Sequence, residues 1–571
     1  MATLASGTAL VDKLSLQHRL FAALSDMFGR EVPLYDKSLL VNRATNRAVR
    51  GLLAKVHPGF ALSDAELERT SGERHGAIRI GRPDEYRWIG RLFGCFAMEP
   101  HGFYDMTAVG ARSQPIIATA FRSSVRPEHR VFTSLLTTDW FDDATRARIE
   151  ARLATRRVFS DRAKALVEKC EKDGGLSAAD ADLLVAECTD RIFKWTGRAR
   201  DHALYRDLSA AGFRIAADIA CFESHHLNHL TPNTLCMDLY TAAMRHAMGE
   251  IDAAAFRARA VVVLARLAKA ADRDFMKLHF KHVPLAEIAA YGAGGVDAAD
   301  IDAAADALAA ELAQPAYALH LLPHAGFKDF TEGPSEDTPV LLRQDAYKAL
   351  TEPVAFAEED GSTVETTHTA RFGEIEERGY ATTPAGRALY DECLAAAEAA
   401  RAADPSLAKR DFAAYEAMNA SHFARFPKSL RALVEAGLVF ARYEPTAKGL
   451  EAAAAGAVPA TIDLLALVDA GLVDFEGLRY EDFLPVSAAG IFASNLQQYG
   501  TKSTAEARPT YSQAMLEEIL GRPIVDTSAV SAALEAESML DCYGRLGLLD
   551  RVPAERRASL EARVSAFRGR P

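Results

Sequence analysis

The stretch RHGAIRIG, residues 74–81, has the pattern of a buried β-strand. Because successive side chains of a strand point to opposite faces, its two isoleucines share one face, and His75, Ala77 and Arg79 share the other. At a rise of about 3.3 Å per residue, His75 and Arg79 lie about 13 Å apart. The small Ala77 leaves space between them. This face therefore presents a potential metal ligand and a fixed cation to one cavity, which suits an anionic, chelating substrate.

The composition of the 571-residue chain is that of a globular protein, with 49% hydrophobic and 25% charged residues. Its formal net charge of −12 argues against nucleic acid or an anionic membrane as the main partner. No apolar run of about 18 residues predicts a membrane span, and the N-terminus lacks the pattern of a secretory signal. Seven scattered cysteines without a CxxC pair indicate reduced thiols and a cytoplasmic location.

Strand and helix patterns alternate irregularly along the chain, which predicts an α+β fold. A short helix is expected over residues 63–70, with Ser63 or Asp64 as its N-cap. Residues 142–220 have mostly helical patterns, and the stretch 212–234 is interpreted as a strand that runs into a histidine cluster. The other expected elements are helices at 10–28, 83–96 and over most of 386–440, and stretches with strand character at 115–122, 129–137, 338–350, 352–359 and 367–392.

Changes in composition divide the chain into four parts. Residues 238–315 are rich in alanine and helical in pattern, and they differ from both flanking regions, as an inserted helical module would. We expect this module to lie outside any metal cavity. The predicted parts are 1–237 with the first metal-site strands, the insertion 238–315, 316–385 with further metal-site strands, and a helical region 386–571.

Three separate places carry side chains that bind metals: His75, the cluster at 225–229 and the carboxylates at 374–376. Two histidines and one carboxylate on different strands form the arrangement that leaves coordination positions open on ferrous iron. Within the cluster, we favour His229, which precedes a proline turn at the expected end of the strand. His225 is the alternative on the same face, and the cluster is also compatible with a solvated turn without metal.

Glu374 and Glu376 share one face of their strand, and Gly373 removes bulk beside the first. Two buried carboxylates on one face require cations. A metal accounts for one of them, and Arg371 or Arg378 for the other. The alternative is that both carboxylates lie on the exposed face of an antiparallel strand. Likewise, the Arg79 side chain is compatible with a structural ion pair.

Six blocks of sequence, spread from about residue 10 to about residue 500, carry a family resemblance. They are RHGAIRIG, NHLTP, ATAFR with RVFTSLL, VLLRQ with KAL, HTARFGEIEERG with TPAGRALYD, and FLPVSAAGIF. Together they resemble the 2-oxoadipate dioxygenase/decarboxylase family of the vicinal oxygen chelate superfamily. The resemblance implies a curved β-sheet that encloses a metal site, surrounded by many helices.

The same resemblance implies an Fe(2+) enzyme of lysine breakdown that converts 2-oxoadipate and O2 to 2-hydroxyglutarate and carbon dioxide. It places the iron ligands at His75, His229 and Glu374, and the arginine that binds the substrate at Arg79. It also places Val486 and Ser487 at the substrate pocket.

Three departures from the family pattern are visible: Glu377 stands where glutamine is usual, QDAYK replaces a Q-T-S-x-K stretch, and the block 238–315 is longer than expected. The first two are expected to change hydrogen bonds around the site or the choice of substrate. The third is expected to affect assembly or access rather than chemistry. The alternatives to the dioxygenase are a metal-dependent lyase or isomerase of the same superfamily and an inactive protein that binds a small molecule. A lyase of that kind usually needs a fourth protein ligand, for which His368 and Glu376 are the candidates.

Overall fold

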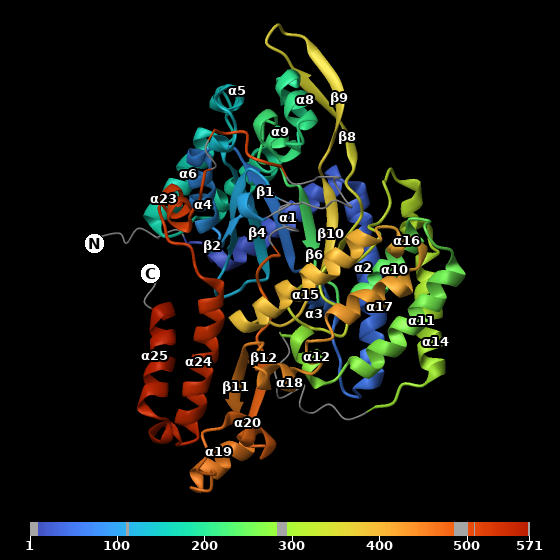
Figure 1. Ribbon diagram of the computed structural model, residues 1–571, viewed down its shortest axis with the longest axis vertical. Coiled ribbons are helices and arrows are strands. Elements are labelled where there is room, and N and C mark those ends of the chain that lie inside the picture. Colours follow the sequence, from blue (N-terminus) through green and yellow to red (C-terminus); the bar gives the residue numbers. More distant parts are fainter. Residues whose placement is uncertain (1–8, 110–112, 282–293, 485–500, 507–508, 569–571) are drawn as a thin grey trace, which may run out of the picture.

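A seven-stranded mixed sheet lies at the centre of the protein (Figure 1). The computed structural model describes residues 9–109, 113–281, 294–484, 501–506 and 509–568. The strand order is β2-β3-β4-β1-β6-β10-β7, so β1 has neighbours on both sides, and the sheet curls into a half-barrel. The strands are β1 (Arg74–Ile80), β2 (Glu99–Asp105), β3 (Ile116–Arg122), β4 (His129–Leu136), β6 (His229–Pro232), β7 (Leu342–Ala346) and β10 (Phe372–Arg378).

Strand β1 has the two faces that its sequence predicts. All seven of its residues are buried. Ile78 and Ile80 belong to the large core that the N-terminal helices share, whereas Ala77 packs in a second core with Phe132 and Phe483. The strand pairs in parallel with β4 and antiparallel with β6. The metal-capable face of β1 is therefore covered rather than exposed, and the α+β prediction is confirmed.

Local signals determine where several helices begin. Helix α3 (Asp64–Ser71) starts after Ser63, whose side chain forms a reciprocal capping box with Glu66, so Ser63 rather than Asp64 is the cap. Helix α4 (Pro83–Gly94) begins at a proline, which fits the first turn of a helix because no partner is needed for its missing N–H. Helices α1 (Lys13–Glu31) and α2 (Pro33–Val56) also follow the predicted apolar pattern.

The prediction of a strand just before the histidine cluster is wrong. Residues Arg214–Cys221 form helix α9, and seven of its eight residues are buried. The polar residues Arg214 and Asp218 lie four positions apart, a spacing that places both on one face of a helix and also on one face of a strand, so this short sequence alone does not separate strand from helix. As a result, His229 opens β6 instead of ending a strand.

Helices surround the central sheet, and the strands of two smaller sheets lie toward opposite ends of the molecule, with β8 and β9 at one end and β11 and β12 at the other (Figure 1). One smaller sheet has the order β5-β8-β9, and the other is the pair β11-β12. The strands of these sheets are β5 (Arg198–Arg200), β8 (Thr351–Ala357), β9 (Thr363–Thr369), β11 (Ala441–Pro445) and β12 (Val473–Gly477). The principal remaining helices are α5 (Asp143–Ala154), α6 (Asp161–Asp173), α7 (Ala178–Glu187), α8 (His202–Ala210), α15 (Pro384–Ala403), α17 (Phe412–His422), α23 (Gln513–Leu520), α24 (Thr527–Arg545) and α25 (Ala554–Arg568).

The alanine-rich block 238–315 is helical throughout most of its described part. It contains most of α10 (Met237–Ala247), together with α11 (Ala253–Ala270), α12 (Arg273–His279) and α14 (Ala298–Leu312). Helix α10 is buried along most of its length and contacts β7 and β10, so it is part of the central core. The four-part division of the chain stays a prediction. No described helix is long and apolar enough to cross a membrane, and all seven cysteines are buried thiols.

A glycine next to the predicted carboxylate gives a first testable prediction. A Cβ atom on Gly373 would lie 2.4 Å from the ring of Tyr347, which is fully buried. We therefore expect Gly373→Ala to lower the free energy of unfolding by about 1–3 kcal/mol, as overpacking of a core does. Urea denaturation measures this change. The control is Gly51→Ala in helix α2, where a Cβ meets nothing within 4 Å and should stabilise by about 0.5–1 kcal/mol. Equal effects of both substitutions would contradict the packing argument.

Candidate metal centre

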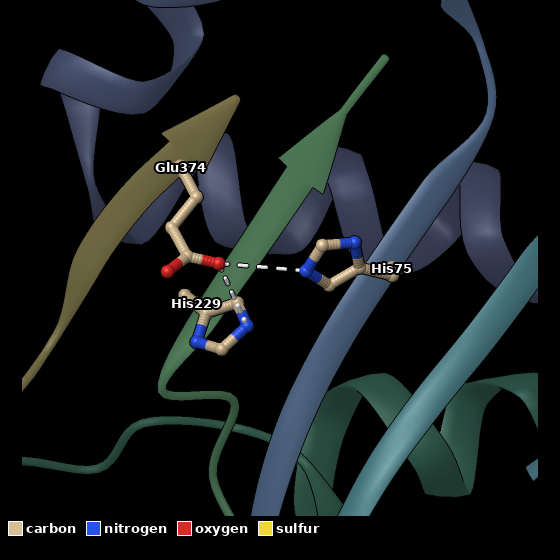
Figure 2. A group of neighbouring side chains, drawn as sticks. All are labelled: His75, His229 and Glu374. Atoms are coloured by element: carbon tan, nitrogen blue, oxygen red, sulfur yellow. Dashed lines mark ion pairs between the residues drawn. The ribbon is translucent and has the colours of Figure 1, made fainter. Parts of the chain in front are cut away.

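Three neighbouring strands bring His75, His229 and Glu374 together (Figure 2). In the register of β1 and β6, His75 lies opposite Thr231, and Ala77 lies opposite His229. Strand β10 runs parallel to β6, with Gly373 beside Leu230. Because side chains alternate along each strand, the two histidines and the carboxylate project from the same side of the sheet.

The three side chains meet around one carboxylate oxygen. Oε2 of Glu374 lies 3.4 Å from Nε2 of His75 and 3.3 Å from Nε2 of His229. The hydroxyl of Thr231 donates a hydrogen bond to the same oxygen at 3.1 Å. One ligand atom from each of the three residues lies within 4.8 Å of the others (Figure 2). Within the described part of the chain, this is the group with the spacing to hold a metal ion.

The donor atoms of this group fit a divalent cation. The Nε2 atoms of His75 and His229 and the Oε1 atom of Glu374 are buried and have no hydrogen-bond partner among the residues that the structure describes. Buried polar atoms without partners are costly, and one shared cation would satisfy all three. Two imidazole nitrogens and one carboxylate form the set that suits ferrous iron with open coordination positions.

The pKa shifts of His229 and Glu374 favour metal binding, whereas the shift of His75 means that a metal ion has to displace a proton from that ring. Burial lowers the pKa of His229 to about 4, although the nearby Glu374 opposes this shift. At neutral pH this ring therefore keeps a lone pair on nitrogen. Burial also disfavours a charge on His75, but Glu376 and Glu374 outweigh it and raise its pKa. Burial opposes ionisation of Glu374 as well, yet the two histidines lower the pKa of that carboxyl.

Glu376 contacts the ligand residue His75 but does not belong to the ligand group. Its Oε2 atom lies 2.8 Å from Nδ1 of His75, the ring nitrogen that faces away from Glu374. Both of its oxygens accept hydrogen bonds from Arg378, at 2.7 and 2.9 Å, and Arg130 adds a bond of 3.3 Å. Burial opposes a charge on Glu376, but the nearby arginines and His75 hold the pKa of this carboxyl well below its usual range. Of the two arginines that the sequence suggested, Arg378 is the partner.

The other candidate histidines contact carboxylates outside the ligand group. His225 lies 3.4 Å from Glu85, and His226 lies 3.3 Å from Asp218. His368 also lies 3.3 Å from Asp218. Among the residues that the structure describes, neither His368 nor Glu376 belongs to the ligand group. The fourth protein ligand that a lyase of this superfamily would need is therefore not present in the described part of the site.

Comparisons with known proteins identify the family of the chain. A family model described as 2-oxoadipate dioxygenase/decarboxylase matches residues 20–257 and 252–495. The chain belongs to this family. A 2-oxoadipate dioxygenase/decarboxylase of Pseudomonas putida is 35% identical over 542 residues, which cover 94% of this chain and 97% of that protein. One from Escherichia coli is 31% identical over 91% of this chain and 96% of its own length.

A solved structure extends the comparison to three dimensions. The crystal structure of the Pseudomonas putida hydroxyglutarate synthase in complex with 2-oxoadipate is 33% identical in sequence. It superposes with a TM-score of 0.65 and covers 94% of this chain and 99% of that chain. The similarity therefore extends over most of the chain of this dioxygenase/decarboxylase family member.

The structure places Arg79 and Glu377, two further residues that the resemblance singles out, in ion pairs. Arg79 lies on the same face of β1 as His75 and forms an ion pair with Asp218, with a separation of 2.7 Å. Its role toward a substrate stays a prediction. Glu377, one of the departures from the family pattern, pairs with Arg343 at 3.2 Å. Val486 and Ser487 lie outside the described residues.

Sequence reasoning did not find Thr231, Arg130 or Asp218. Thr231 follows His229 by two positions, so strand alternation is a signal that places both on one face. No local signal identifies Arg130, which reaches Glu376 from β4, or Asp218, which reaches Arg79 from α9. Their partners are far away in the sequence, and only the folded chain brings them together.

The position of Glu376 behind His75 gives a second prediction. We expect Glu376→Gln to weaken metal binding about 10–100-fold, because the loss of a carboxylate behind a histidine ligand has this effect. Competition with a metal-binding dye measures the affinity. The control is Glu352→Gln, which removes the carboxylate partner of another buried arginine, Arg371, away from the ligand group. An unchanged affinity in Glu376→Gln, or an equal loss in the control, would contradict a supporting role for Glu376.

Proposed function

We propose that this protein converts 2-oxoadipate and dioxygen to 2-hydroxyglutarate and carbon dioxide as a step of lysine breakdown. The observation that carries the proposal is the buried group His75, His229 and Glu374 on three adjacent strands. It occurs in a chain that matches the 2-oxoadipate dioxygenase/decarboxylase family over most of its length. The solved relative with bound 2-oxoadipate supports a 2-oxo diacid as the substrate.

The three side chains would hold ferrous iron. When bound there, the iron supplies open coordination positions for a 2-oxo acid and dioxygen and the redox chemistry for decarboxylation and oxygen insertion. Glu376 orients His75: its carboxylate lies by Nδ1 and so favours a proton there, which leaves the Nε2 lone pair directed at the site. Thr231 restrains Glu374 through its hydroxyl hydrogen bond.

The protein also excludes water from this site. The exposed fractions of His75, His229 and Glu374 are 0%, 0% and 3%. In a site closed to water, charged contacts are stronger and reactive species are protected from side reactions. Arg79 supplies the cation that pairs with the distal carboxylate of the diacid and fixes its position through charge-assisted hydrogen bonds.

The atoms of the proposed reaction balance without a further reactant. One 2-oxoadipate and one dioxygen contain every atom of one 2-hydroxyglutarate and one carbon dioxide. The substrate carries its own 2-oxo acid group, so a separate 2-oxoglutarate cosubstrate is not required. This distinguishes the proposed reaction from that of oxygenases that consume such a cosubstrate.

An oxygen electrode and product analysis test the proposal. Protein stripped with a chelator is reloaded with Fe²⁺ or with Zn²⁺ and supplied with 2-oxoadipate. We expect oxygen uptake and an equal amount of 2-hydroxyglutarate with Fe²⁺ only. With ¹⁸O₂, the new carboxylate of the product should carry label. Turnover without oxygen uptake, or equal activity with zinc, would favour a lyase or isomerase instead, and no turnover at all would favour a binding protein.

A further inference from the structure

A buried carboxylate on helix α9 holds the guanidinium of Arg79. Nη1 of Arg79 donates a hydrogen bond to Oδ2 of Asp218 at 2.7 Å. The side chains are 6% and 2% exposed, so this contact is shielded from water and from screening by salt. A guanidinium has five N–H donors, so one arginine is able to bridge two carboxylates. A bond to Asp218 is therefore compatible with a second bond to a substrate.

Two histidines flank the other oxygen of the same carboxylate. Oδ1 of Asp218 lies 3.3 Å from Nε2 of His226 and 3.3 Å from Nε2 of His368. On its far side, Nδ1 of His368 lies 2.9 Å from the hydroxyl of Tyr205, within hydrogen-bond distance. Both oxygens of Asp218 thus face polar partners, and these partners come from β1, β9 and the loop before β6.

Aromatic rings fix the two histidines in place. The ring of Trp195 stacks on His368, with centroids 5.9 Å apart and an interplanar angle of 17°. The same indole meets His226 edge-on at 4.7 Å, and Phe222 lies 4.6 Å from His368. Imidazoles packed between rings have little rotational freedom, so Asp218 itself has little freedom to move.

The carboxylate of this cluster is ionised and forms a buried ion pair with Arg79. Burial opposes ionisation of Asp218, but His226, His368 and Arg79 together hold the pKa of its carboxyl well below the usual value. The carboxylate therefore stays ionised and bonds to Arg79 as a charged partner. Arg79 in turn shares the face of β1 that carries His75, so the cluster fixes a cation at one end of the face and the ligand group lies at the other.

We propose that Asp218, with His226 and His368, is a positioning residue that sets the place of the Arg79 guanidinium and thereby the selectivity for 2-oxo acids with a distal carboxylate. This inference rests on the proposed function. Asp218 acts through Arg79 and does not contact the reacting atoms. Without the carboxylate, Arg79 keeps its charge but loses its fixed orientation, so the site should lose preference for a diacid more than it loses the capacity for chemistry.

The variant Asp218→Asn tests this inference because it keeps the shape and removes the charge. Two substrates of equal chain length are compared: 2-oxoadipate, and 2-oxohexanoate, which has a methyl group in place of the distal carboxylate. We expect the ratio of their kcat/KM values to fall at least about tenfold from that of the wild type, mainly through a higher KM for the diacid. The Kd for 2-oxoadipate without oxygen should rise by a similar factor, while the bound iron stays unchanged.

The chain contains a control of similar composition, in which a buried carboxylate contacts one arginine and one histidine. Glu85 is a buried carboxylate that pairs with Arg156 at 2.6 Å and lies 3.4 Å from His225. Arg156 also donates to the carbonyl of Ile219 in helix α9, so this trio supports the same helix. We expect Glu85→Gln to lower the thermal unfolding temperature about as much as Asp218→Asn but to leave the diacid preference within about twofold of the wild type.

A second variant covers the case in which Asp218→Asn does not fold. His368→Gln removes one flanking imidazole and leaves the carboxylate in place, and we expect a smaller loss of diacid preference. An unchanged preference in the folded variants, or an equal loss in Glu85→Gln, would overturn the inference while the proposed function stands. A wild-type protein that does not turn over 2-oxoadipate would overturn both the inference and the proposed function. The activity of the wild type is therefore measured before any variant is made.

Discussion

Glu374→Ala is expected to abolish iron binding and turnover while the protein stays folded. Its carboxylate is the group that both histidines of the proposed ligand set contact, and Thr231 orients it. The loss of a ligand should exceed the about 10–100-fold loss of affinity that follows the loss of a supporting group. Iron content after gel filtration and oxygen uptake with 2-oxoadipate measure the effect. Circular dichroism checks the fold, and His75→Ala and His229→Ala should behave in the same way.

The comparison with Glu376→Gln decides which carboxylate binds the metal. The second variant should keep measurable iron at high metal concentration, because the three ligands remain. If Glu374→Ala retained stoichiometric iron and Glu376→Gln lost it, the assignment of the ligand on β10 would be wrong. Glu376 would then have to leave Arg378 and Arg130, with which it now shares a buried network.

Arg79→Ala should lower kcat/KM for 2-oxoadipate by about ten- to a few hundred-fold, because charged hydrogen bonds contribute about 1.5–3 kcal/mol. Iron content should barely change. Arg79→Lys is not conservative here, because a point charge replaces a two-pronged fork that Asp218 holds in one orientation. With 2-oxohexanoate, the wild type should show a strong penalty, and Arg79→Ala should lose most of this discrimination.

The buried ion pair requires one further control for Arg79. Arg79→Ala leaves Asp218 buried without its charged partner, which is expected to cost about 3–5 kcal/mol of stability. The double variant Arg79→Ala with Asp218→Asn removes both charges and should recover much of that stability without recovering the diacid preference. If wild type and Arg79→Ala prefer the diacid equally, Arg79 is structural, and another cation recognises the substrate.

The sequence alone determined the properties that depend on near neighbours in the chain. Strand alternation put His75 and Arg79 on one face of β1 and Glu374 and Glu376 on one face of β10, and both strands formed as predicted. Ser63 was a predicted cap of α3, and Arg378 was a predicted partner of Glu376 two positions away. These features follow from backbone geometry and side-chain reach over a few residues. The place of His229 before a proline turn favoured it within its cluster, whereas the family resemblance selected Glu374 over Glu376.

The tertiary structure decided which of these faces meet. Strand β6 lies between β1 and β10, and this order brings His75 next to Glu374 across a large separation in sequence. It also decided that residues 214–221 form a helix, because a helix of eight residues is stabilised mainly by the packing of its buried side chains. Asp218 reaches Arg79 from that helix, and Arg130 reaches Glu376 from β4. Pairings between distant segments depend on how the whole chain packs, so no local pattern determines them.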